Sequence, residues 1–94
     1  MELLLDGRSI RSEALFHDVI DRAALSAGFD GYGRNLDALW DVLTAILPIP
    51  VEVRWTDSDA SRQAIGPRFD MLVQVMRDAE KELGPADFRL RVES

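Results

Sequence analysis

Two carboxylates are the first residues whose types and spacing could do chemistry. Asp37 and Asp41 are four positions apart, and at about 100° of rotation per residue a helix would place them about 40° apart on one face. On the same scale Thr44 would lie near about −20° and Ala45 near about +80° from Asp37, with Trp40 at the edge of this face. The pattern predicts a helix face with two acids, a hydroxyl group and an aromatic ring.

Such acids are also compatible with an ordinary solvated helix surface, where Asp37 gains from the positive end of the helix dipole. Against this, like charges four residues apart repel by about 0.2–0.5 kcal/mol, aspartate is a poor helix former, and no basic residue lies between Asn35 and Leu47. Local penalties without local compensation indicate a functional role, while the ordinary surface interpretation stays open. Trp40 is open to both interpretations, as a core residue or as the anchor of an interface.

Catalysis by the same acids is not expected. A pair of carboxylates can act as general acid and base, but the chain has no Cys, a single His and no recognisable nucleophile with its base. A convex helix face gives no pocket that could shift a pKa, and two acids without a third ligand make a poor metal site. We therefore expect a binding protein without enzyme activity, metal or cofactor.

The charge balance restricts the class of partner. The 94 residues include 17 acidic and 11 basic side chains, a net charge of −6. Direct binding of nucleic acid needs basic residues that displace counterions, so we expect none. An acidic surface suits a basic protein, although it also simply keeps a small protein soluble. Pro48 and Pro50 interrupt the longest apolar run and no secretory signal is visible, so we expect a cytoplasmic protein without membrane contact.

The elements that would position these residues follow from periodicity. A short apolar run that ends in the turn signal Asp6-Gly7 predicts a strand at Leu3–Leu5. Alternation of apolar residues predicts two more strands, at Val51–Trp55 and Phe88–Val92. Helical spacing, capping residues and Gly-Pro breaks predict helices that start at Ser12, at Asn35, at Asp57 and at Gly66-Pro67. The second of these should end at Pro48 and the last at Gly84-Pro85.

The order of the elements predicts the fold class. Strands joined by helical crossovers are parallel, and the charged residues that alternate along the second and third strands leave one sheet face wet. We therefore expect an α/β fold of two layers, a three-stranded parallel sheet with about four helices on one side. The length predicts a single domain over residues 1–94. Strand order is not fixed by the sequence.

One run of residues resembles a known family. The run reads Tyr32-Gly33-x-Asn35-Leu36-Asp37-Ala38-Leu39-Trp40-Asp41-x-Leu43-Thr44. It resembles the signature of barstar, the family of intracellular inhibitors of barnase-type ribonucleases. The segment Asp6-Gly7-x-x-Ile10-x-Ser12 with His17, and the segment Val73–Ala79, are similar to other parts of the family, so the resemblance covers essentially the whole chain.

The resemblance implies a barstar-like fold and a partner, a basic secreted ribonuclease of the barnase type bound one to one. It implies that Asp41 enters the pocket for the RNA phosphate, that Asp37 pairs with a basic residue nearby, and that the ring of Tyr32 packs over the catalytic histidine region. His17 matches a family position and is interpreted as structural. The partner-binding residues implied in this way are Tyr32, Gly33, Asn35, Asp37, Ala38, Trp40, Asp41, Thr44, Ala45 and Asp78.

The chain also departs from the family pattern. Gly31 stands where the family often has a second aromatic residue, Arg34 where an acid is common, and Ala45-Ile46 where a Gly-Trp pair is typical. Val42 occupies the position of a family cysteine. These departures support an alternative, an interaction or immunity domain of the same fold that binds a different basic toxin or a regulatory partner.

Overall fold

The alternating segments form the three strands. The computed structural model describes all of residues 1–94 and contains strands β1 (Glu2–Asp6), β2 (Val51–Thr56) and β3 (Phe88–Val92). In β1 the side chains of Leu3 and Leu5 are buried, whereas Leu4 between them is 63% exposed. This is the period of two that a half-buried strand requires, and it confirms the strands predicted from the sequence.

The sheet has the order β1-β2-β3, and both pairs are parallel. Leu5 faces Trp55 in the first pair, and Trp55 faces Val92 in the second. The parallel three-stranded sheet is therefore confirmed, and the structure adds the strand order, with β2 in the centre.

Side-chain caps set the starts of two helices. The helices are α1 (Glu13–Ser26), α2 (Leu36–Asp41), η1 (Val42–Ile46), α3 (Ser58–Ile65) and α4 (Arg68–Leu83). The Ser12 hydroxyl accepts a hydrogen bond from the Leu15 N–H at 3.1 Å and caps α1. α4 begins directly after Pro67, one residue later than a proline in the first helical position would imply, and it ends at Gly84, whose φ of 87° is accessible to glycine.

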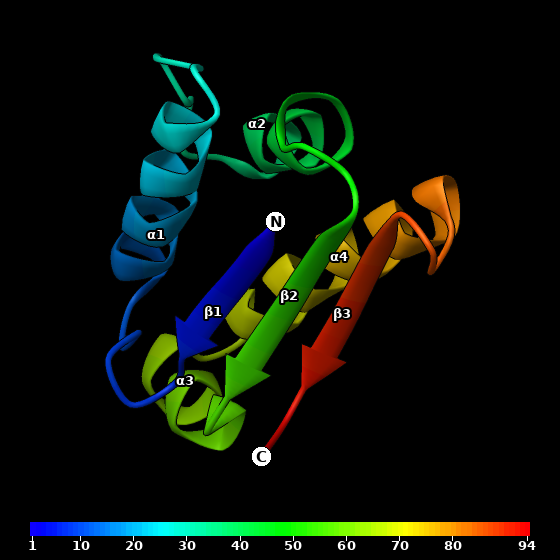
Figure 1. The fold of residues 1–94 in the computed structure, drawn as a ribbon. Coiled ribbons are helices and arrows are strands. Elements are labelled where there is room, and N and C mark those ends of the chain that lie inside the picture. The colour runs from blue at the N-terminus through cyan, green and yellow to red at the C-terminus, as the bar shows by residue number, and fades with distance from the viewer.

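The helices cover one face of the sheet. In Figure 1, α4 crosses behind the strands, α1 runs beside β1, and α2 and α3 lie at opposite ends of the sheet. The open face carries ion pairs, from Arg54 to Glu93 at 2.8 Å and from Arg91 to Glu52 at 3.6 Å. The predicted two-layer arrangement with one wet face is confirmed.

Aromatic rings fill the space between sheet and helices. Trp55 on the central strand stacks on Phe16 of α1 with 5.4 Å between ring centroids, and lies 4.9 Å from the ring of Phe69 on α4. All three side chains are fully buried, and rings of this size dominate the apolar burial that holds a small core together. The same packing fixes α1 and α4 relative to β2. No helix has both the length and the apolar character needed to cross a membrane.

Candidate functional site

The start of α2 is held by its own N-cap. The side-chain oxygen of Asn35 accepts a hydrogen bond from the Ala38 N–H at 2.8 Å, and the extended backbone of Asn35 (φ −142°) is the conformation that an N-cap adopts. Leu39 is fully buried, and the next turn buries Val42 and Leu43. Because α2 and η1 pack on α4, these buried apolar side chains fix which face of the helix points outward.

Asp37 and Asp41, here called the acidic pair, lie on that outward face. Both side chains are exposed, and neither takes part in a hydrogen bond or an ion pair within the chain. No basic residue of the molecule neutralises them, so their mutual repulsion is unrelieved in the free protein. The acidic pair is available to donors from outside the molecule.

The helix widens after the acidic pair. The Leu47 N–H donates to the Val42 carbonyl at 3.0 Å, a bond between residues five apart, and Val42–Ile46 form a π-helical turn. A wider turn rotates less per residue, so the positions predicted for Thr44 and Ala45 at 100° per residue are wrong. Ala45 is exposed, whereas Thr44 is half-buried and its hydroxyl donates to the Trp40 carbonyl at 2.7 Å.

Trp40 combines the two interpretations offered by the sequence. Its side chain is half-buried and packs against the hydrophobic core. Its indole N–H has no hydrogen-bond partner in the molecule. This nitrogen must therefore reach the surface, since every buried side-chain nitrogen or oxygen has a hydrogen-bond partner. The ring of Trp40 therefore packs on the core side of the helix, and its indole N–H can donate to an acceptor from outside the molecule.

Tyr32 lies inside the fold, which differs from the expectation that its ring faces a partner. Its side chain is 6% exposed, and its hydroxyl is 2.7 Å from Nδ1 of His17, which is 3% exposed. The other ring nitrogen of His17 is 3.1 Å from a carboxylate oxygen of Glu13. Tyr32 thus anchors the loop before α2 to helix α1, and His17 has the structural role expected of it.

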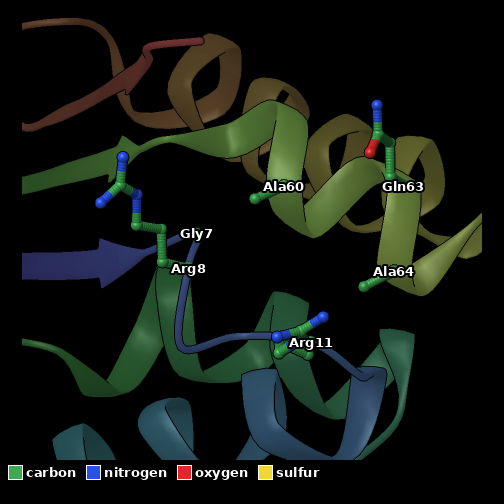
Figure 2. Close-up of a pocket in the computed structure, with 6 residues that line it drawn as sticks. All are labelled: Gly7, Arg8, Arg11, Ala60, Gln63 and Ala64. Carbon is green, nitrogen blue, oxygen red and sulfur yellow. The ribbon is translucent and has the colours of Figure 1, made fainter.

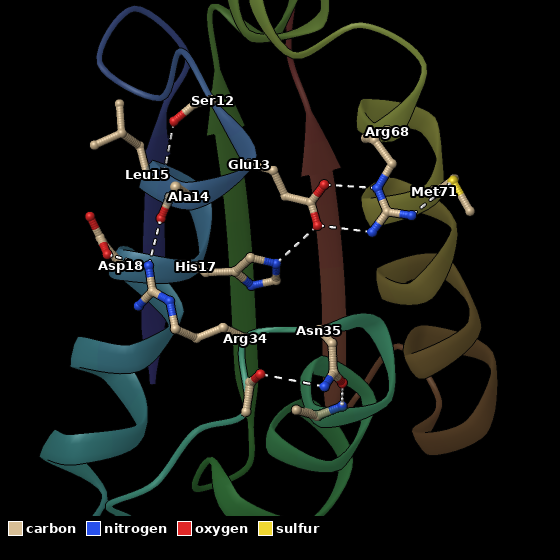
Figure 3. Close-up of polar contacts among 12 residues, drawn as sticks. Ser12, Glu13, Ala14, Leu15, His17, Asp18, Arg34, Asn35, Arg68 and Met71 are labelled. Atoms are coloured by element: carbon tan, nitrogen blue, oxygen red, sulfur yellow. Dashed lines mark hydrogen bonds and ion pairs between the residues drawn. The ribbon is translucent and has the colours of Figure 1, made fainter.

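Arg68 binds Glu13 at the other end of this network (Figure 3). This ion pair determines which atoms of the network carry protons. Two guanidinium nitrogens of Arg68 donate to the two Glu13 oxygens at 2.8 and 2.9 Å, and these bonds lower the pKa of Glu13 to about 2. An ionised Glu13 only accepts hydrogen bonds, so Nε2 of His17 carries the proton that it donates. Burial raises the pKa of Tyr32, so its O–H remains intact, and it donates to Nδ1 when His17 is neutral.

Arg34 fastens the same loop from outside. Its guanidinium donates to the Ala14 carbonyl at 3.0 Å and to Asp18 at 2.5 Å, as Figure 3 shows. It also lies 3.6 Å from Asp21. All three partners belong to α1. The positive charge that replaces the acid common in the family is therefore turned towards α1 and paired there, away from the acidic pair. The backbone of Arg34 has a φ of 55°, in the left-handed region.

The remaining candidate residues play different parts. Gly33 is exposed, and a Cβ at this position would lie 3.2 Å from the Cβ of Ala38, which is tight. Asp78 is on α4, is exposed, and accepts a hydrogen bond from Gln74 at 2.9 Å. The structure brings Gly33, Asn35 and Ala38 together at the start of α2, and no hydrogen bond or ion pair links Asp78 to that group. No cluster of three or more histidine or acidic side chains could hold a metal ion.

Comparison with known proteins agrees with this arrangement. The family model described as "Barstar (barnase inhibitor)" matches residues 1–94. The chain belongs to the barstar family. A protein of Bacillus subtilis (strain 168) named "Putative ribonuclease inhibitor YrdF" is 32% identical over 93 residues, which cover 98% of this chain and 98% of that protein. The family membership predicted from the Tyr32–Thr44 signature is thus confirmed, and the fold is barstar-like throughout.

Proposed function

We propose that this barstar-family protein inhibits a ribonuclease by inserting the acidic pair into the enzyme's substrate site. The observation that carries the proposal is the state of Asp37 and Asp41, which are exposed and unpaired on a helix whose start, inner face and preceding loop are all fixed. Other acids such as Asp59 are also exposed and unpaired, but Asp37 and Asp41 repel each other on a helix that carries no basic residue.

The chemistry of the proposal is imitation of phosphate. A pocket that cleaves RNA contains donors and positive charges placed to stabilise the negative charge of the reacting phosphate. Carboxylate oxygens on a helix accept hydrogen bonds from such donors, and they contain no bond that the enzyme can cleave. Asp41 is proposed to occupy the phosphate position, and Asp37 to pair with a neighbouring basic residue.

Preorganisation supports tight binding. Every side chain or loop that becomes ordered only on association costs affinity. Here Tyr32 and Arg34 hold the loop on α1, and Asn35 caps the helix, so the binding surface is already formed in the free protein. We propose that Trp40, Thr44, Ala45 and Asp78 add contacts around the acidic pair, and that Gly33 and Ala38 let the enzyme approach closely.

The proposed partner is a basic ribonuclease of the barnase type, bound one to one, which the inhibitor meets in the cytoplasm. The net charge of −6 would attract a basic enzyme and accelerate the encounter. The protein itself performs no catalysis in this proposal, and it binds neither RNA nor a membrane.

A second candidate is a different basic toxin or regulatory partner. It is favoured by Gly31, which is exposed and offers no side chain where the family often has a ring, and by the half-buried Ile46 in place of a tryptophan. Fewer aromatic contacts leave the charges as the main source of specificity. A pull-down that recovers a basic protein without ribonuclease activity would favour this candidate.

The test is a titration of RNA cleavage. Increasing amounts of the purified protein are added to a fixed amount of a barnase-type ribonuclease, and cleavage of a fluorescent RNA is followed. The proposal predicts a linear loss of activity that ends near one equivalent. Full cleavage with a large excess of correctly folded protein, for each such enzyme from the same organism, would contradict it.

A further inference from the structure

A hollow lined by two arginines lies at the end of the sheet away from α2. It has a volume of about 490 Å³ and lies between the loop that follows β1 and helix α3, as Figure 2 shows. Its lining residues are Gly7, Arg8, Arg11, Ala60, Gln63 and Ala64, and we call it the basic hollow. The volume is in the range of small-molecule sites, about 300–1,000 Å³.

The walls of the basic hollow are fixed by buried contacts. The Ser61 hydroxyl, on the buried side of α3, lies 3.1 Å from the Gly7 carbonyl and 2.7 Å from the Ile10 carbonyl, and thereby ties the loop to the helix. Gly7 also donates to the Thr56 carbonyl at 2.7 Å, and a Cβ on Gly7 would lie 1.9 Å from the Asp57 carbonyl oxygen. The backbone walls of the hollow are therefore formed in the free protein, and a ligand would have to order only the polar side chains.

The polar side chains that line the basic hollow make few hydrogen bonds or ion pairs within the molecule. Arg11 is exposed and forms no ion pair, and the Gln63 amide forms no hydrogen bond within the chain. Arg8 has only a loose contact, 3.7 Å to Asp57. Most other arginines are engaged more closely, as Arg68 is with Glu13 at 2.8 Å. Two guanidinium groups and an amide thus remain free of hydrogen bonds at the rim of the hollow, and in Figure 2 the Arg8 and Gln63 side chains extend in different directions.

The acidic character of the whole protein does not cancel this local charge. The acidic pair lies before the amino end of β2, and α3 follows its carboxyl end, so the six residues of β2 separate them. At about 3.3 Å per residue this is roughly 20 Å, whereas charges in about 0.15 M salt are screened over about 8 Å. A ligand in the basic hollow therefore meets the two arginines together with the acids beside them, Asp6, Asp57 and Asp59.

We propose that the basic hollow binds a small oxyanion that carries two or more negative charges, of the phosphate and polyphosphate class. Guanidinium groups bind phosphate oxygens through paired, charge-assisted hydrogen bonds, and the Gln63 amide supplies a further donor. No aromatic ring lines the hollow, so nothing there would stack on a base. The anion itself is recognised, and its binding leaves the α2 face free.

The test uses inorganic pyrophosphate as the probe. The folded, ¹⁵N-labelled protein is titrated at constant ionic strength set by chloride, and backbone amide shifts are followed. The proposal predicts saturable one-to-one binding, with the largest shifts in the loop after β1 and in α3. Arg11→Gln should weaken binding about tenfold or more, and Asp57→Asn, which frees Arg8, should tighten it about two- to fivefold. Asparagine suits the left-handed backbone of Asp57, φ 48°.

The matched control is Arg22→Gln, which removes an exposed, unpaired arginine of α1 that does not line the basic hollow. Its affinity for pyrophosphate should equal that of the unmodified protein. Shifts that grow without saturation, or an equal loss of affinity in Arg11→Gln and Arg22→Gln, would show only general attraction between charges and overturn the proposal. Arg11→Gln should still inhibit ribonuclease fully, so this test and that of the proposed function fail separately.

Discussion

The hydrogen bond between Tyr32 and His17 predicts a specific loss of stability in the variant Tyr32→Phe. Phenylalanine keeps the ring and its packing, so the change creates almost no cavity and removes only the hydroxyl group. The Nδ1 atom of His17 then has no partner at a site where the side chain is 3% exposed. An unsatisfied buried polar atom of this kind costs about 1–3 kcal/mol.

The assay is urea unfolding at neutral pH, followed by the fluorescence of the two tryptophans. A cost near about 2 kcal/mol should lower the urea midpoint at constant slope, and it should lower the melting temperature by roughly 8–16 °C for a protein of this size. A double-mutant cycle with His17→Leu isolates the contact, because Tyr32→Phe should cost less than about 0.5 kcal/mol once the acceptor is gone.

Two results would refute this reasoning. The first is a Tyr32→Phe variant within about 0.5 kcal/mol of the unmodified protein, the range of an ordinary surface substitution. The second is the same cost of Tyr32→Phe in the presence and absence of His17, which would place the effect outside the hydrogen bond.

Three further variants test other parts of the structure. Glu13→Gln should be less stable than the unmodified protein at neutral pH. Because folding lowers the pKa of Glu13 from 4.5 to about 2, this difference in stability should shrink as the pH falls from about 4.5 to 2 and vanish below. Urea midpoints measured against pH test this, and a difference that stays constant would contradict it. Gly7→Ala should cost about 3 kcal/mol or more, because its Cβ would meet the Asp57 carbonyl oxygen at 1.9 Å; a thermal melt within about 2 °C of the unmodified protein would contradict the close approach. Arg34→Asn keeps a residue suited to the left-handed backbone and should cost less than about 1 kcal/mol, yet amide exchange in residues 31–35 should accelerate; unchanged exchange there would show that Arg34 does not hold the loop.

The strands and helix starts could be predicted because their signals are local. Alternation in Val51–Trp55 is visible in five successive residues, and Ser12 and Asn35 cap helices through bonds to residues three positions away. The order of the strands could not be predicted, since a helical crossover between parallel strands leaves open which strands become neighbours.

The π-helical turn was missed because its apolar residues imitate a regular helix. Leu39, Leu43 and Leu47 repeat every four residues, a spacing that a straight α-helix also produces. Only the bond from Leu47 to Val42 reveals the wider turn, and with it the partial burial of Thr44. No residue type in the sequence marks the change.

The supports of the site were missed because they join distant parts of the chain. The partner of Tyr32 is 15 residues away, and that of Arg68 is 55 residues away. A single tyrosine before a helix gives no sign that it is buried, and Arg34 gives no sign that its charge turns towards α1. The acidic pair itself was recognisable, since two unrelieved like charges on one helix are a local anomaly.

The most direct test of the proposed inhibition compares Asp41→Asn with Asp59→Asn. Both changes remove one negative charge and both side chains are exposed and unpaired, but Asp59 lies in the first turn of α3, far from α2 along β2. Isothermal titration with a barnase-type ribonuclease should show that Asp41→Asn loses about 2–5 kcal/mol of binding free energy, a general range for buried interfacial charge pairs whose reference cases include barnase and barstar. Asp59→Asn should lose less than about 0.5 kcal/mol. Equal losses in the two variants would mean that only net charge matters, and would contradict a phosphate-like role for the acidic pair.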